Sequence, residues 1–378
     1  MCDNNKTNLR KAYEQRFPAF SQHLLTWLTG KALPGQRPFW RLSPWIIFAT
    51  LLSMFCGSVY CAVLLVMSGY VGAYALLPFI WVLTVAGAMG LELTVRHECE
   101  HAQFTGHRRV DTFIMEFITI ILFIRNGEGY RDVHVKHHHR QSYLSTHHDP
   151  HVMVLGLYGF RAGMSRTALW RQLWKTLFSP LFHVRHIALR AKTNYDGPHL
   201  WRKIACTLYL LSWVTLVVLT PVAALLVTLG FVIPVFVLTN MTFLLEIISE
   251  HPWSPTHQEP TVDATVYAQK CRAIFCGAPL PALSLSRVKK ISAYGVWGIR
   301  MVGHFIIRLT VLPGPLCAHD LHHRAQNAFD WREAAYARER IIAQLPPSAP
   351  PYRETWGLKA ALNDVFTSIS QAPADENT

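Results

Sequence analysis

Charged residues are missing from two long stretches of the sequence, residues 42–91 and 204–245. At a rise of about 1.5 Å per residue, each stretch can cross a hydrocarbon core of about 30 Å twice as a helix. This absence predicts an integral membrane protein with four transmembrane helices in two hairpins. The predicted spans lie at about 44–67, 74–94, 204–222 and 227–249.

Acidic residues are also scarce, because 23 Asp and Glu oppose 36 Lys and Arg and leave a net charge of +13. With 51% hydrophobic residues, this excess indicates a membrane protein with basic cytoplasmic faces and argues against a nucleic-acid partner. The predicted hairpin turns, near 68–72 and 220–226, contain no Lys or Arg. Basic residues instead flank the other ends of the spans: Arg37, Arg41, Arg96, Arg202 and Lys203. The positive-inside rule then predicts a protein of the bacterial inner membrane, with both termini and every histidine cluster in the cytoplasm.

Features of secreted proteins are missing as well. The eight cysteines contain no CxxC pair and no spacing typical of a disulfide framework, so we expect no disulfides. Residues 1–28 are polar and amphipathic, so we expect no cleavable signal peptide. Both absences agree with domains that face the cytosol.

The hydrophobic stretches divide the chain into three parts and predict an all-α fold. Residues 1–43 are expected to form a cytosolic amphipathic arm with one surface helix at 7–28. Residues 44–330 are expected to form the membrane domain, with a cytosolic helical cap that carries the histidines. Residues 331–378 are expected to form a cytosolic tail that ends in a marginal helix.

Three shorter stretches predict helices at the membrane surface. Residues 111–124 are apolar but too short to span, and they include Glu116. Residues 155–202 interleave basic and apolar side chains, which is typical of amphipathic helices on an anionic membrane. Residues 297–312 are apolar but interrupted by charge, so we expect them to lie in the interface.

Histidine is abundant, with 20 residues, and eight of them form three closely spaced clusters. One cluster is an i, i+4 pair and two share the pattern HxxHH, so a helix would present each set on one face. HxxHH is expected only about 0.05 times by chance in this composition, whereas a single HxxxH pair such as His147 and His151 is expected about once. The clusters are His97 and His101; His134, His137 and His138; and His319, His322 and His323.

These clusters predict a centre that holds two metal ions. Neutral imidazole is the commonest protein metal ligand, and eight such side chains are too many for one ion. A ninth ligand is expected from His251, at the end of the last predicted span, or from His304. Asp149 and Asp320 are expected to orient ligands by accepting the N–H of the outer ring nitrogen.

A redox metal pair beside lipid is suited to oxygen chemistry on an unactivated hydrocarbon chain, which no side chain can oxidise alone. Three motifs then resemble the histidine boxes of the membrane fatty-acid desaturase/hydroxylase superfamily, in order and in spacing. They are H-E-C-E-H at 97–101, H-V-K-H-H at 134–138 and H-D-L-H-H at 319–323. The resemblance covers about residues 44–330.

The resemblance implies that all eight clustered histidines are catalytic ligands of two non-haem iron ions, with O2 as co-substrate. It implies an acyl or lipid-like substrate that gains a double bond, with hydroxylation as the alternative. Electrons are expected from an external ferredoxin, rubredoxin or cytochrome b5-type donor, because the sequence contains no H-P-G-G haem motif. The sequence departs from many desaturases at Ile247, where they have an Asn that ligates through water. The triplet at 249–251, S-E-H, is more similar to that of sphingolipid-type and hydroxylating relatives.

The sequence leaves two alternatives to a lipid-oxidising enzyme: a metalloprotease and a metal transporter. The first box spells HExxH, so His97 and His101 could bind zinc in an intramembrane metalloprotease with Glu98 as general base. His107 then falls at the position of a third zinc ligand, but Phe104 replaces the glycine of that longer motif, and the HxxHH clusters have no role. A histidine-rich metal transporter is expected to carry polar ligands at mid-membrane depth, but the two long apolar stretches of this sequence contain no charged residue and no histidine.

Overall fold

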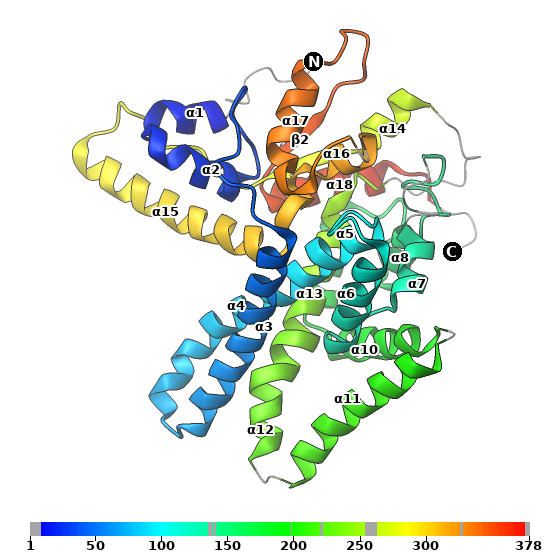
Figure 1. Ribbon diagram of the computed structural model, residues 1–378. Coiled ribbons are helices and arrows are strands. Elements are labelled where there is room, and N and C mark those ends of the chain that lie inside the picture. The colour runs from blue at the N-terminus through cyan, green and yellow to red at the C-terminus, as the bar shows by residue number, and fades with distance from the viewer. Residues whose placement is uncertain are drawn as a thin grey trace.

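The computed structural model describes residues 9–134, 138, 141–197, 199–219, 222–253, 263–325 and 328–374, so the predicted ligand His137 lies outside the described residues. The described chain is mostly helical, and two helical hairpins extend from one side of a larger helical body (Figure 1). Four helices are long and apolar enough to cross a membrane, which confirms the predicted number. They are Pro44–Met67, Val71–Glu100, Leu200–Leu219 and Ala223–Glu250.

The first hairpin joins α3 (Pro44–Met67) to a helical rod of 30 residues. Ser43 caps α3 by accepting a backbone hydrogen bond, and Pro44 lies in the first turn, where no N–H is needed. The helices approach closely at Gly87, because a Cβ there would lie 2.7 Å from the backbone nitrogen of Phe55. The rod consists of η2 (Val71–Leu76), α4 (Leu77–Gly90), η3 (Leu91–Arg96) and α5 (His97–Glu100). It continues beyond the hydrophobic stretch and carries His97, as the sequence predicts.

The second hairpin has the same design. It joins α11 (Leu200–Leu219) to a rod made of α12 (Ala223–Val227), η5 (Thr228–Leu238) and α13 (Thr239–Glu250). The π-helical segment η5 contains Pro234, which lacks the N–H that a regular α-helix requires at this point. The hairpins contact each other where the indole N–H of Trp81 donates to the carbonyl of Leu229 at 2.7 Å. The second rod ends at Glu250, directly before His251.

The hairpins expose many large apolar side chains, whose contact with water would be energetically unfavourable. On α11, Leu208, Leu211 and Val218 are 62%, 52% and 75% exposed. On α3, Tyr60 and Met67 are 62% and 63% exposed. Such a large continuous apolar surface fits a helix that faces lipid.

The segment between the hairpins forms five body helices: α6 (Arg108–Ile121), α7 (Gly127–Val133), α8 (Pro150–Leu157), α9 (Arg166–Leu177) and α10 (Pro180–Tyr195). The first of them corresponds to the predicted stretch 111–124. Its acidic residue, Glu116, is 8% exposed and accepts hydrogen bonds from the side chain of Arg202 and from the N–H of Gly127. These partners allow the carboxylate to lie inside the protein.

The apolar stretch predicted at 297–312 is part of a longer helix, α15 (Arg287–Thr310). The chain bends by 110° after α15 and continues into η6 (Gly314–Ala318) and α16 (His319–Arg324). Gly314 has a φ of 57°, and a Cβ at this position would lie 2.2 Å from Oγ1 of Thr94. The bend therefore brings the third histidine cluster against the rod that carries the first.

The carboxy-terminal segment is packed into the body, whereas the sequence predicted a tail with a marginal helix. Strand β1 (Arg272–Phe275) pairs in parallel with β2 (Arg353–Trp356), so the fold includes a small sheet that the all-α prediction omitted. The last helix, α18 (Leu358–Gln371), contacts α9 and α13 and buries a row of apolar residues: Leu362, Val365, Phe366 and Ile369. Helix α14 (Ala264–Lys270) directly precedes β1, and η7 (Trp331–Glu333) with α17 (Ala334–Ala343) precedes β2.

The amino-terminal arm is also divided differently from the prediction. The expected single helix at 7–28 is broken at Pro18 into α1 (Leu9–Arg16), η1 (Ala19–Ser21) and α2 (Gln22–Thr29). Helix α2 lies beside α15, as Figure 1 shows. The hydroxyl of Tyr13, which is fully buried, donates to the carbonyl of Ala278 at 2.6 Å and holds the arm to the body.

Candidate metal centre

Four elements bring the predicted histidines together: α5, the segment that follows α7, the end of α13, and α16. Among the described residues, the possible metal-binding atoms form two larger groups and a smaller third one, His138 with Asp149 and His151, and within each group they all lie within 4.8 Å of one another. The first cluster is His97, His101, His134 and His322. The second cluster is His138, Glu250, His251, His319 and His323.

The two clusters are neighbours. The ring centroids of His134 and His138 lie 5.5 Å apart, and those of His319 and His322 lie 5.7 Å apart. Each HxxHH motif therefore contributes to both clusters. Paired metals in proteins are about 3.5–4 Å apart, so neighbouring clusters of this size match a two-metal site.

In the first cluster, the imidazoles converge through their Nε2 atoms. The Nε2 atoms of His97 and His134 lie 3.0 Å apart, and the ring of Tyr130 stacks on His134 with centroids 5.1 Å apart. The Nδ1 atom of His97 lies 3.3 Å from Oε1 of Glu98. Burial and the neighbouring Arg131 and His319 lower the pKa of His101 to about 4, so its imidazole is neutral and able to bind a metal.

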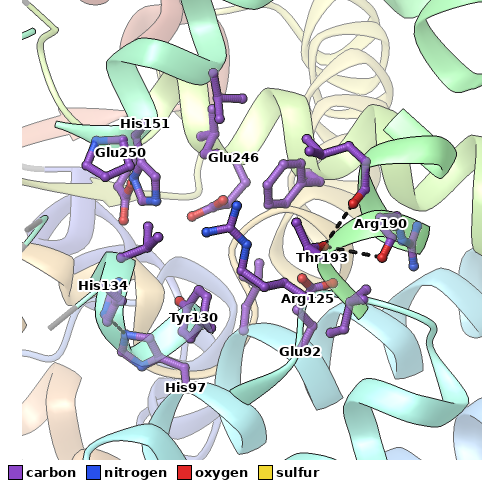
Figure 2. A pocket seen from close by; sticks show the side chains of 18 of the residues that line it. Glu92, His97, Arg125, Tyr130, His134, His151, Arg190, Thr193, Glu246 and Glu250 are labelled. Carbon is purple, nitrogen blue, oxygen red and sulfur yellow. Dashed lines mark hydrogen bonds and ion pairs between the residues drawn. The ribbon is translucent and has the colours of Figure 1, made fainter. Parts of the chain in front are cut away.

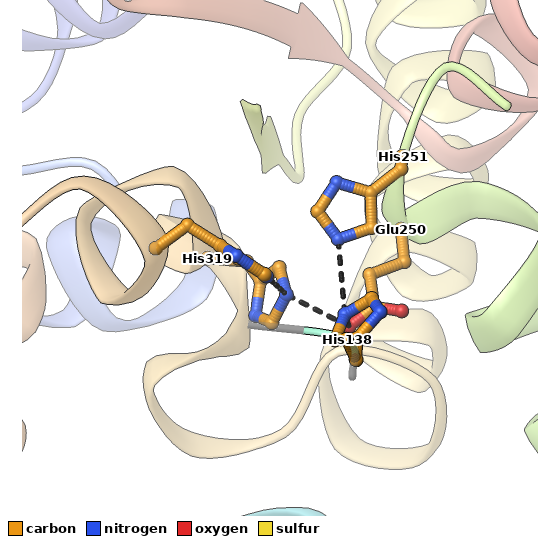
Figure 3. Close-up of side chains that lie close together, drawn as sticks. His138, Glu250, His251 and His319 are labelled. Atoms are coloured by element: carbon orange, nitrogen blue, oxygen red, sulfur yellow. Dashed lines mark hydrogen bonds and ion pairs between the residues drawn. The ribbon is translucent and has the colours of Figure 1, made fainter. Parts of the chain in front are cut away.

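The second cluster combines imidazoles with a carboxylate (Figure 3). Oε1 of Glu250 lies 2.7 Å from Nε2 of His319 and 3.7 Å from Nε2 of His138. The Nε2 atoms of His138 and His251 are 3.3 Å apart, and those of His319 and His323 are 2.9 Å apart. So many inward-facing nitrogen and oxygen atoms in a buried space fit the ligands of a metal ion.

The outer ring nitrogens of the second cluster contact groups that fix the orientation of each ring. Nδ1 of His251 lies 2.8 Å from the carbonyl of Lys270, which can only accept, so His251 presents an Nε2 lone pair inward. Nδ1 of His323 lies 3.1 Å from the hydroxyl of Tyr267, and Nδ1 of His138 lies 3.3 Å from the carboxylate of Asp149.

Asp149 also acts on the charge of His138. Burial lowers the pKa of His138, but Asp149 and Glu250 outweigh it and raise this pKa to about 10. Metal binding at His138 must therefore release a proton. Conversely, although burial opposes it, contact with His138 leaves the pKa of Asp149 below its usual range.

The structure places the predicted carboxylates in different roles. Asp149 lies beside an imidazole, whereas Asp320 is fully buried and accepts hydrogen bonds from Arg338 at 2.8–3.1 Å. This pair ties α16 to α17 instead of orienting a ring. His304 and His107 lie outside both clusters as the described residues define them, which favours His251 over His304 as the ninth ligand.

Two residues of the centre were missed in the sequence. Glu250 belongs to the second cluster, and the only signal was its place in the S-E-H triplet before His251. The sequence predicts only a chance pair or a rim feature for His147 and His151, yet the ring of His151 lies 4.1 Å from that of His138 and its Nδ1 lies 3.3 Å from Oε2 of Glu250. His147 instead packs on His148, with centroids 4.0 Å apart.

A cavity of about 510 Å³ adjoins both clusters. His97 and His134 of the first cluster and Glu250 and His319 of the second form part of its wall. Elsewhere it is largely apolar, with lining residues that include Leu93, Ile124, Val154, Leu157, Leu189 and Phe243. Its volume falls in the range of small-molecule sites, about 300–1,000 Å³.

Comparison with known proteins agrees with this geometry. The family model described as fatty acid desaturase matches residues 75–278, more than half of the 378 residues. The match includes the first two histidine boxes and His251, and it ends before the third box. Comparison with curated proteins and with solved structures gave no match. The chain therefore belongs to the fatty acid desaturase family, a family of oxidoreductases.

Proposed function

We propose that this protein is an O2-dependent di-iron membrane enzyme that introduces a double bond into an acyl or lipid-like chain. The observation that carries the proposal is the pair of neighbouring buried clusters beside an apolar cavity. External electron carriers of the ferredoxin, rubredoxin or cytochrome b5 type supply the electrons in this proposal. The oxidation of two C–H bonds together with the reduction of O2 to water requires two such electrons.

The side chains present fit a pair of iron ions. Imidazole and carboxylate ligands suit divalent iron, and four imidazoles in the first cluster face four imidazoles and a carboxylate in the second. In the proposed assignment, each cluster holds one metal ion. His137, which the sequence predicts to be a ligand, joins them. Bound iron supplies the redox chemistry with O2 that amino-acid side chains lack.

The chain's own residues position the substrate. Apolar walls exclude water and bind hydrocarbon, while four metal-binding side chains line the same cavity. A carbon chain in this cavity therefore contacts the residues that hold the metals. Positioning of this kind selects which C–H bond is oxidised.

The membrane placement follows from the hairpins. Their tips point away from the body that contains the histidine clusters, so both hairpins can enter a bilayer from one side (Figure 1). We place this body on the cytoplasmic side, because the basic residues at the bases of the hairpins follow the positive-inside rule.

Two observations speak against the zinc-protease alternative. The proposed third ligand, His107, is exposed and lies apart from the cluster that contains His97 and His101. Glu98 contacts the outer nitrogen of His97, at 3.3 Å, instead of the inward face where a substrate water would be activated.

The test is a count of bound metal, combined with lipid analysis. Purified wild-type protein is expected to hold two irons per chain, and mass spectrometry of lipids from expressing cells should show new double bonds. The His323→Ala variant should lose bound iron and should form no new double bonds. His107→Ala is the matched control, because this exposed histidine lies outside the clusters. One zinc per chain would contradict the proposal, and alcohols in place of alkenes would identify a hydroxylase.

A further inference from the structure

The cavity beside the metal centre contains a cation with no ionic partner. Arg125 lines the cavity, and Figure 2 shows its side chain projecting into the middle of the space. Across the residues that the structure describes, no hydrogen bond or ion pair involves its guanidinium group. Burial and the neighbouring Arg96 lower the pKa of Arg125, which means that its charge is destabilised where it lies.

The backbone on both sides of Arg125 is held in place. Arg190 donates to the carbonyl of Leu122 at 2.6 Å and to that of Phe123 at 3.1 Å. On the other side, the side-chain amide of Asn126 donates to the carbonyl of Thr193 at 2.6 Å. A charged group on a fixed backbone loses little entropy when it binds a ligand, so this arrangement favours recognition.

The acidic residues that line the cavity are Glu92, Asp132, Glu246 and Glu250, and within the described part of the chain none of them forms an ion pair with Arg125. Glu92 pairs with Arg96 at 3.3 Å, and Glu250 contacts His319 at 2.7 Å. Glu246 faces the same space in Figure 2, but it forms no ion pair with Arg125 among the described contacts. Asp196 is exposed, and it affects Arg125 only by a Coulombic interaction that raises the pKa of the guanidinium, without a hydrogen bond or ion pair among the described contacts.

Among the charged residues that line the cavity, Arg125 is therefore a cation with no hydrogen bond or ion pair to any residue that the structure describes. Arg190, which also lines the cavity, is 7% exposed, and its hydrogen bonds go to neutral acceptors, among them the side chain of Asn240 at 2.8 Å. Arg125 thus faces a space in which apolar side chains form most of the exposed wall. A ligand that fits must offer both an anionic group and an apolar chain.

We propose that Arg125 binds the anionic head group, a carboxylate or a phosphate, of an amphiphilic substrate inside the cavity. This inference rests on the proposed function, which makes the cavity the place where the chain reacts. A guanidinium binds either group with two parallel hydrogen bonds. The carbonyl end of an acyl ester or thioester is neutral and cannot form an ion pair with Arg125. The proposed substrate is therefore a free anionic amphiphile or a lipid whose phosphate lies in the cavity.

Binding of matched probes tests the proposal. Dodecanoate, dodecyl phosphate and dodecanol share one alkyl chain and differ in head group, and their affinities for the purified protein in nanodiscs can be compared by calorimetry. Wild-type protein is expected to bind at least one of the anions about tenfold or more tightly than dodecanol. Arg125→Gln should remove this preference and leave dodecanol binding unchanged, and Arg125→Lys should retain part of it.

The matched control is Arg185→Gln, which removes an equal charge from the exposed face of α10 and should keep the full preference. The anion whose affinity falls more in Arg125→Gln identifies the head group as carboxylate or phosphate. Equal affinity of wild-type protein for the anions and dodecanol, or a full preference in Arg125→Gln, overturns the proposal. Metal counts on the same samples separate the two proposals, because anion binding at Arg125 does not depend on whether iron or zinc is present.

Discussion

At the scale of single residues, the centre depends on which nitrogen of each imidazole faces inward. The second cluster shows the rule most clearly, because the carbonyl of Lys270 fixes Nδ1 of His251 as a donor. The residue that follows a helix end is thereby turned into a metal-binding group. The neighbouring Glu250 adds a carboxylate to the same cluster.

The proposed ninth ligand gives a first prediction. His251→Ala removes a fully buried imidazole from the second cluster, so the iron content should fall below two per chain. His304→Ala is the control, since His304 lies apart from both clusters and should leave the iron content unchanged. Elemental analysis of monodisperse protein measures the difference, and iron lost only from His304→Ala would reverse the assignment.

A second prediction concerns pH and a histidine outside the clusters. Burial, together with Arg190 and His183, lowers the pKa of His186 to about 3. Between about pH 6.5 and pH 3 the unfolded chain binds a proton at this site and the folded chain does not, so folding stability should fall as the pH falls through this window. Above pH 6.5 both states are neutral and the site contributes no pH dependence.

The measurement for His186 is thermal unfolding in detergent at pH 7.5 and pH 5. His186→Asn should lose less stability on acidification than the wild type, by on the order of 1 kcal/mol or more. Tyr158, whose hydroxyl lies 2.6 Å from Nδ1 of His186, remains in the variant as a local hydrogen-bonding group. An identical loss in both proteins would contradict the predicted site.

At the scale of elements, the geometry depends on rods that continue past the membrane and on one sharp bend. The rods end in α5 and α13, so the first rod carries His97 and the second carries Glu250 to the metal centre. The 110° bend after α15 then returns α16 to the same place. Contact between the bend and the first rod, at Gly314 and Thr94, sets the distance between these elements.

The bend supplies the third prediction. Gly314→Ala adds a Cβ to a residue with a φ of 57° and places it 2.2 Å from Thr94, so α16 must shift. We expect lower stability, by roughly 1–3 kcal/mol, and a reduced iron content. Gly35→Ala is the matched control, because Gly35 has a φ of 74° with open space around it and should show only the backbone strain.

At the scale of the whole molecule, the carboxy-terminal segment packs against the helical body and completes its hydrophobic core. Helix α18 packs on α9 and α13, and its strand neighbour β2 pairs with β1. Phe366 lies at the centre of this contact, edge-on to Trp170 at 5.1 Å and stacked with Phe160 at 6.2 Å. The body is therefore held together by residues far apart in sequence.

The fourth prediction follows from this packing. Phe366→Ala leaves a cavity in a site with no solvent exposure and should cost about 3–5 kcal/mol of stability. Phe20→Ala, at a side chain that is 86% exposed, should cost little and serves as the control. Thermal unfolding and size-exclusion profiles in detergent distinguish them, and equal stability of the two variants would show that α18 is dispensable.

Local patterns in the sequence were sufficient for the spans and for most of the centre. Uncharged stretches of 50 and 42 residues have few stable alternatives to paired transmembrane helices, and HxxHH spacing depends only on helix periodicity. The family resemblance agrees with the family match, which covers the first two boxes and ends before the third. The rods were predictable for the same reason, since nothing at 91–96 interrupts the helical pattern.

Only the tertiary structure decided how the ligands are shared and what joins them. The sequence placed each HxxHH motif on one face, but packing divides its histidines between two clusters and adds Glu250 and His151 from other segments. The parallel pairing of β1 with β2 joins segments about 80 residues apart, and α18 packs on α9 and α13, which are more than 100 residues away, so no local pattern encodes these contacts. Long-range packing also placed the guanidinium of Arg125, which has no hydrogen bond or ion pair among the described residues, beside the metal centre.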